Sequence, residues 1–154
     1  MEAFLAALEA SGPAQWLRVS RWGYAAANTA HVMGLATLYG AILALDLRLL
    51  GLWRGARLDA LLAVLPRVAA TGLALALATG VLLFAIRAGE YAALGVFRLK
   101  MALVALGTAA ALLTALRGGL AGASPRRMRA MGGLSLVAWT GALVSGRMIA
   151  FAGD

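Results

Sequence analysis

Residues 22–45 read WGYAAANTAHVMGLATLYGAILAL and contain no Asp, Glu, Lys or Arg. A helix rises about 1.5 Å per residue, so this stretch can cross the roughly 30 Å hydrocarbon core of a bilayer. That core offers no water, and every backbone N–H and C=O must find a partner within the protein. Apolar and polar residues do not alternate here, which excludes a membrane strand. The stretch therefore predicts a transmembrane helix.

Three further apolar blocks follow, at residues 68–86, 101–116 and 130–151. The block at 101–116 is short, and it becomes long enough if Arg98 and Lys100 extend their charged heads to the interface. The connections are also short, so we expect neighbouring helices to run antiparallel. The sequence thus predicts an all-α, polytopic membrane protein. Its single domain, residues 1–154, has four transmembrane helices in an up-down bundle.

The composition is typical of a membrane protein, with 63% hydrophobic and 13% charged residues. Soluble domains have roughly half and a quarter, respectively. The absence of cysteine excludes a disulfide-stapled fold and a Cys-ligated metal site. A net charge of +8 would suggest nucleic acid in a soluble protein. Here the basic residues are scattered between apolar blocks, so we expect the lipid bilayer as partner and no nucleic acid.

The first ten residues place Phe4, Leu5 and Leu8 on one helical face, which predicts a short N-terminal interfacial helix. Orientation follows from the Lys and Arg residues beside each span. The side with the first and third connections carries eight Lys and Arg residues and the opposite side six, which favours both termini on the outer side of the membrane, the periplasm in a bacterium. The eight are Arg48, Arg54, Arg57, Arg67, Arg117, Arg126, Arg127 and Arg129; the six are Arg18, Arg21, Arg87, Arg98, Lys100 and Arg147.

His31 is the one histidine of the chain, and it lies roughly 14 Å into the first span. Asn28 is one turn earlier on the same face. A neutral imidazole at that depth can ligate haem iron or another metal, hydrogen-bond a quinone, or relay a proton. It can also donate to a neighbouring backbone carbonyl and fasten two helices together. The sequence leaves these readings open.

Two charged groups near the span ends are the other candidates. Arg147 is about one turn from the end of the fourth span, and antiparallel helices would bring it into the same half of the membrane as Asn28 and His31. There its guanidinium could bind an acidic group of a cofactor, such as a haem propionate, or the side chain could simply extend to the membrane interface. Asp46 ends the first span and Arg67 begins the second after Pro66, so we expect a structural ion pair across the first hairpin.

Small residues recur every four positions on three of the spans, a spacing that lets helix backbones approach in lipid. The rows are Gly72, Ala76 and Gly80; Gly107, Ala111, Ala115 and Gly119; and Ala138, Ala142, Gly146 and Ala150. They predict tight helix packing without naming the helix pairs.

Several stretches resemble an uncharacterised family of small bacterial four-span membrane proteins. They are NTAHVMGL at residues 28–35 continuing to DLRLLG at 46–51, FRLKM at 97–101 and GRMIAF at 146–151. The resemblance implies the fold and a bacterial inner membrane, and no activity. A looser likeness to four-helix b-type cytochromes rests on the intramembrane histidine alone. Those proteins carry several such histidines.

The chain contains no Walker loop, HExxH or Ser-His-Asp set, so we expect a binding protein more than an enzyme. The hypothesis is that His31, Asn28 and Arg147 bind haem b or a quinone, with His31 as the iron ligand in the haem case. The protein would then be an electron-transfer or redox-accessory subunit with a redox partner in the membrane. A bis-histidine iron would need His31 from two protomers, which favours a homo-oligomer. The alternative is a non-catalytic scaffold or small-solute permeation protein in which His31 is structural.

Overall fold

The computed structural model describes residues 1–120 and 122–152, and these residues form helices and loops without a strand. The helices are α1 (Glu2–Glu9), α2 (Gly12–Val19), α3 (Arg21–Leu50), α4 (Leu58–Ala85), α5 (Ala88–Ala93), α6 (Gly95–Leu116) and α7 (Pro125–Met148), followed by the 3-10 turn η1 (Ile149–Phe151). The all-α prediction is therefore confirmed.

Four of these helices, α3, α4, α6 and α7, are long and apolar enough to cross a membrane. They cover the four predicted spans except residue 86, which follows α4, and residues 149–151, which form η1, and most of them begin well before the apolar blocks. α4 begins ten residues earlier than the predicted span and continues through Pro66. α7 begins at Pro125, where the Ser124 hydroxyl accepts a hydrogen bond from the Arg127 backbone N–H at 3.3 Å. A helix does not end where its side chains become charged, and at α7 the Ser124 cap marks the true beginning.

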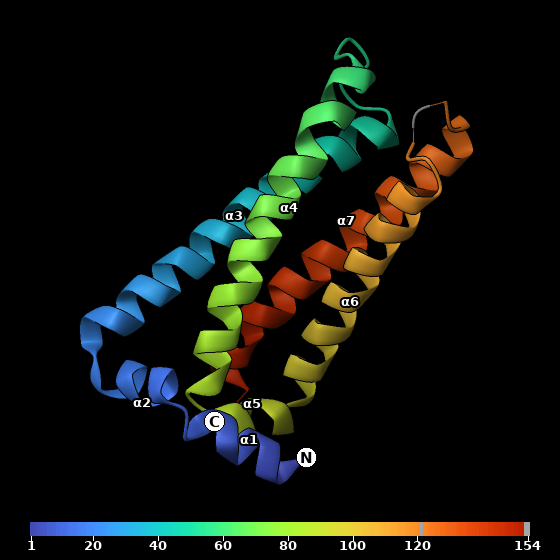
Figure 1. Ribbon diagram of the computed structural model, residues 1–154. Helices are drawn as coiled ribbons and strands as arrows, with labels where there is room; N and C mark the ends of the chain where they lie inside the picture. Colours follow the sequence, from blue (N-terminus) through green and yellow to red (C-terminus); the bar gives the residue numbers. More distant parts are fainter. Residues whose placement is uncertain (121, 153–154) are drawn as a thin grey trace.

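The N-terminal segment forms two short helices, α1 and α2, where the sequence predicted one. Together with α5 they lie at the end of the molecule that carries both termini (Figure 1). The Arg18 guanidinium donates to the Ile86 carbonyl at 2.6 Å and lies 3.5 Å from the Glu9 carboxylate. Glu9 also accepts the Gly89 backbone N–H at 2.8 Å. These contacts attach the segment to the junction between α4 and α5.

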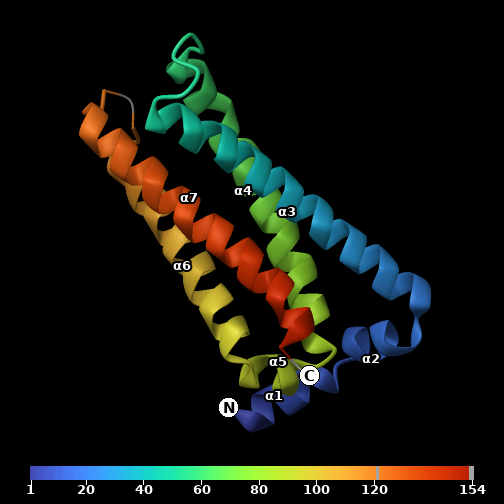
Figure 2. The same ribbon diagram turned by 180° about the vertical axis from the view of Figure 1, so that it is seen from behind.

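The four long helices alternate in direction, as predicted, and form two antiparallel hairpins, α3–α4 and α6–α7 (Figures 1 and 2). The hairpins are joined through α3 and α7. α4 and α6 do not pack along each other over the part of the chain that the structure describes. The prediction of an up-down bundle therefore needs one correction: the bundle is open between α4 and α6. α6 is accordingly the least buried of the four spans.

The predicted rows of small residues make the helix contacts, although not at every position. A Cβ added to Gly34 would lie 2.7 Å from the Ala76 backbone N and 3.0 Å from the Gly72 carbonyl oxygen, so the backbones of α3 and α4 touch here. In the other hairpin, a Cβ on Gly107 would lie 2.7 Å from the Trp139 ring. Ala111 and Ala115 of the same predicted row are exposed.

The predicted ion pair between Asp46 and Arg67 is wrong. Asp46 is 3% exposed and turns towards α7, whereas Arg67 is exposed on α4. The Asp46 backbone lies against Gly132, with the Ser135 side chain beside its carboxylate, and Oδ2 has no hydrogen-bond partner among the described residues. The sequence placed both residues at one end of a hairpin, but it could not show that their side chains leave α3 and α4 in different directions.

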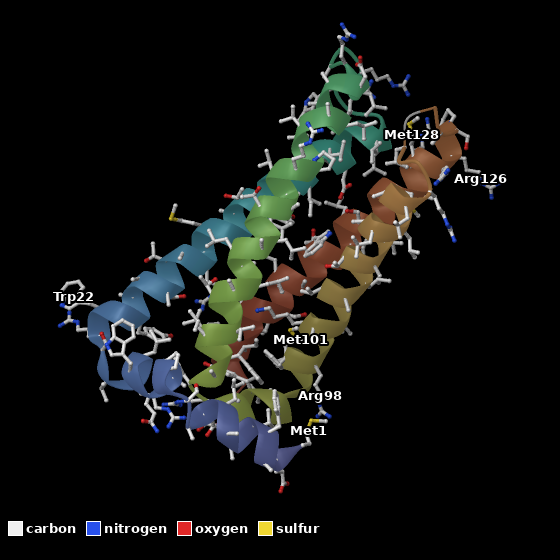
Figure 3. All side chains as sticks on the ribbon, viewed as in Figure 1. Met1, Trp22, Arg98, Met101, Arg126 and Met128 are labelled. Atoms are coloured by element: carbon white, nitrogen blue, oxygen red, sulfur yellow. The ribbon has the colours of Figure 1, made fainter. Side chains whose placement is uncertain are left out.

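Large apolar side chains cover the outside of the long helices, and the buried positions are mainly small residues. The exposed ones include Val32, Leu77, Val81, Leu112, Val137 and Val144. Arginines lie at the ends, where Figure 3 shows Arg98 and Arg126 at opposite ends of the molecule. This distribution is the reverse of a soluble domain and matches a protein whose solvent is a bilayer.

Candidate functional site

The imidazole of His31 lies at the contact between α3 and α4. A Cβ added to Gly80 would lie 3.1 Å from His31 Cε1, so the small residue on α4 makes room for the ring. One residue earlier on α4, the buried Thr79 places its Oγ1 3.0 Å from His31 Nδ1. The predicted row Gly72–Ala76–Gly80 therefore faces α3 and ends at the histidine.

The hydrogen bonds of Thr79 favour the His31 tautomer that carries its proton on Nδ1. Thr79 Oγ1 lies 2.6 Å from the Leu75 carbonyl oxygen, and a carbonyl can only accept. When the hydroxyl hydrogen points to this carbonyl, Oγ1 accepts from His31 Nδ1–H. The backbone carbonyl of Ala76, a second acceptor, also faces the ring. A neutral imidazole protonated on Nδ1 has a lone pair on Nε2, which can accept a hydrogen bond or ligate a metal.

Lys100 of α6 lies close enough to His31 for its positive charge to act on the imidazole. Its side chain is partly buried and lies over α7, where a Cβ added to Gly146 would be 3.4 Å from Nζ. The ion pairs of the described residues are Arg18–Glu9, Arg57–Asp59 and Arg87–Glu90, and Lys100 is in none of them. An ammonium group that is partly buried in an apolar bundle and is in none of these ion pairs is costly, which makes Lys100 a candidate for a binding role.

An aromatic cluster lies one helical turn from this pair, towards α5. The rings of Phe84 on α4 and Phe97 on α6 are stacked with centroids 5.1 Å apart, and Tyr91 of α5 lies 6.4 Å from Phe84. Phe84 follows Gly80 by four residues and Phe97 precedes Lys100 by three, so each ring is a neighbour of the polar site along its helix. The cluster joins α4 to α6 at this end of the open side. Burial raises the pKa of the Tyr91 hydroxyl, which stays neutral.

The other two predicted site residues lie at the surface. Asn28 is exposed on α3, and Arg147 is exposed at the end of α7, with its guanidinium carbon 5.0 Å from the centre of the Phe151 ring. Neither makes a hydrogen bond to His31 in the described part of the chain. Arg147 directly follows Gly146, the residue beneath Lys100, so it does belong to the same end of the bundle.

Sequence reasoning missed Thr79 and assigned Lys100 to the membrane interface. One signal was available for Lys100: it is two residues from Arg98, and the two side chains therefore leave α6 about 200° apart. Only one of them can face lipid and solvent, and Arg98 is the exposed one. Thr79 gave no comparable signal, because a threonine in an apolar helix commonly bonds its own backbone.

The described residues contain no group of three or more His, Asp or Glu side chains that could hold a metal ion. A metal at His31 would therefore depend on ligands outside that set, such as a haem. Two surface grooves are present, one between α6 and α7 and one at the α3–α4 loop, and His31 lines neither of them.

No protein-family model, curated protein or solved structure matches the chain. The chemistry of these residues is therefore the basis for any functional statement, and the resemblance to four-span bacterial proteins stays a prediction.

Proposed function

We propose that the protein is a bacterial inner-membrane protein that binds a quinone beside His31 and Lys100, as an electron-transfer or redox-accessory subunit. The observation that carries the proposal is the bond from His31 Nδ1 to Thr79, because it leaves the Nε2 lone pair as an acceptor. Lys100 supplies a donor from the opposite hairpin. A quinone needs a donor to its carbonyl oxygen, and a quinol needs an acceptor for its hydroxyl hydrogen. The pair provides both kinds of group.

The surroundings of the pair also suit such a ligand. α4 and α6 do not pack along each other, so a lipid-soluble molecule would approach the pair from the bilayer on this side. Phe84 and Phe97 offer apolar ring surface one turn away. Binding sites for small organic molecules are typically apolar with a few convergent polar groups.

Haem b is the second candidate, and the same Nε2 lone pair favours it as an axial ligand. One histidine per chain then makes a bis-histidine iron a site shared by two protomers. The weakly buried α6 leaves surface for a second copy in that homo-oligomer. The positive charge of Lys100 beside the imidazole disfavours a further cationic centre, which is why we place the quinone first.

The scaffold alternative is favoured by the same hydrogen bond, since His31 and Thr79 fasten α3 to α4. An interhelical hydrogen bond of this kind contributes about 1 kcal/mol in a membrane. Under this alternative, His31→Ala lowers stability by that amount and removes no ligand.

The test is extraction of protein purified in mild detergent, with quantitation of quinone and an absorption spectrum. We expect about one quinone per chain and its loss in His31→Ala and Lys100→Met. Arg98→Met is the matched control: it removes the same charge from an exposed residue of the same helix end, and it should retain the ligand. A Soret band with half a haem per chain would select the shared haem site instead. Wild-type protein without quinone or pigment would refute the redox proposal and leave the scaffold.

The orientation is tested separately. Both termini lie at one end of the molecule and the connections after α3 and α6 at the other (Figure 1). With termini in the periplasm, a cysteine near residue 3 should react with an impermeant thiol reagent in intact spheroplasts, and one near residue 122 should not. The opposite labelling would show that the termini face the cytoplasm, and it would leave the four-span prediction unchanged.

A further inference from the structure

A groove of about 460 Å³ lies where the α3–α4 loop meets the beginning of α7. Its polar lining consists of three arginines, one from the end of α3, one from the loop and one from α7. Its apolar lining comes from the adjoining helix ends. The residues that matter here are Arg48, Arg54 and Arg129, with Leu49, Leu58 and Met128. The groove lies at the α3–α4 loop, at the opposite end of the molecule from α5 (Figure 1), and it plays no part in the function proposed above.

Backbone contacts hold two of these guanidinium groups in place. Gly51 ends α3 with a φ of 108°, a left-handed conformation that turns the chain back over the helix end. Arg48 then donates from Nε to the Ala56 carbonyl at 2.9 Å, and Arg54 donates from Nε to the Gly51 carbonyl at 3.3 Å. A guanidinium has five N–H donors, so each group keeps donors for a ligand. Fixing the side chains beforehand also reduces the entropy cost of binding.

The charge around the groove is strongly one-sided. No carboxylate lines it. Of the acidic residues nearby, Asp59 is exposed and paired with Arg57 at 2.7 Å, and Asp46 is buried against Gly132 of α7. The N-terminus of α7, which begins at Pro125, adds the positive end of its helix dipole. Figure 3 shows Met128 turned towards the α3–α4 loop, whereas Arg126 points away from the molecule.

We propose that this groove binds the phosphodiester headgroup of an anionic membrane lipid. The groove lies at the membrane end of the spans, where headgroups are found, and its arginines match the geometry of phosphate oxygens. Leu49, Leu58 and Met128 provide apolar contact for the glycerol and the first acyl carbons. Basic pockets between transmembrane helices bind lipid headgroups in this manner.

The experiment measures lipid binding to the purified full chain by native mass spectrometry, with phosphatidylglycerol and phosphatidylcholine of identical acyl chains as probes. We expect phosphatidylglycerol to bind at least about tenfold more tightly. The double variant Arg54→Gln/Arg129→Gln should bind it about 30-fold more weakly than the unchanged protein. The matched control, Arg117→Gln/Arg126→Gln, removes the same charge from exposed residues at the same end and should change binding less than about twofold.

Three results would overturn the proposal. Equal binding of the two lipids by the unchanged protein would show that the headgroup charge is not recognised, and this comparison needs no variant to fold. Equal weakening in both double variants would assign the effect to diffuse surface charge. Competition by millimolar inorganic phosphate as effective as that by phosphatidylglycerol would make the site one for a free anion and not for a lipid.

Discussion

The contact between Gly34 on α3 and Gly72 and Ala76 on α4 gives a sharp prediction, because the atoms that face Gly34 are backbone atoms. A Cβ at Gly34 would lie 2.7 Å from the Ala76 N, 3.0 Å from the Gly72 O and 3.1 Å from the Ala76 Cα. No side chain can rotate away, so the two helices must separate by several tenths of an ångström. Overpacking of this kind costs about 1–3 kcal/mol.

A control on the same helix separates this cost from the effect of alanine itself. Gly40 has nothing within 4 Å of an added Cβ. Alanine is favoured over glycine within a helix by roughly 0.5–1 kcal/mol, so Gly40→Ala should raise stability by up to that amount. The same gain partly offsets the clash in Gly34→Ala. We therefore expect a net loss of about 1–2 kcal/mol for Gly34→Ala and a difference of about 2 kcal/mol between the variants.

The assay is reversible unfolding of each variant in mixed micelles by a denaturing detergent, with the free energies of unfolding compared. His31 precedes Gly34 by three residues, so separation of the helices should also lengthen its 3.0 Å contact with Thr79 and weaken ligand binding in Gly34→Ala alone. Equal stability of Gly34→Ala and Gly40→Ala would refute the reasoning, because it would mean that α3 and α4 are not in backbone contact in the membrane.

Two further predictions concern the other helix contacts. Asp46→Asn keeps the shape of a buried carboxylate whose Oδ2 has no partner among the described residues, so the free energy of unfolding should stay the same or rise. In a double-mutant cycle with Arg67→Gln the two effects should add within about 0.5 kcal/mol. A coupling energy above about 1 kcal/mol would show that Asp46 and Arg67 do form an ion pair. Trp139→Ala should lower the free energy of unfolding by about 3–5 kcal/mol, because the ring fills the space over Gly107. The control is Val137→Ala, at a side chain that is 70% exposed, which should change the free energy of unfolding by less than about 0.5 kcal/mol. Similar losses in the two variants would contradict the α6–α7 packing.

The sequence by itself determined the number and approximate position of the four long helices. Residues such as those at 22–45 are apolar over the thickness of a bilayer, and a backbone in lipid must satisfy its own hydrogen bonds, so length and composition suffice. It also singled out His31 by depth. The helix ends were less well determined because caps such as Ser124 and Gly51, and not the apolar blocks, set them.

Only the tertiary structure decided which residues meet. That α4 and α6 stay apart, that Asp46 faces α7 instead of Arg67, and that Thr79 and Lys100 accompany His31 all depend on how the helices are rotated about their axes. Lipid solvates apolar side chains on every face of a helix, so hydropathy does not fix this rotation. Shape does: Gly34 and Gly72 allow one backbone to approach another, and that contact turns His31 towards Thr79.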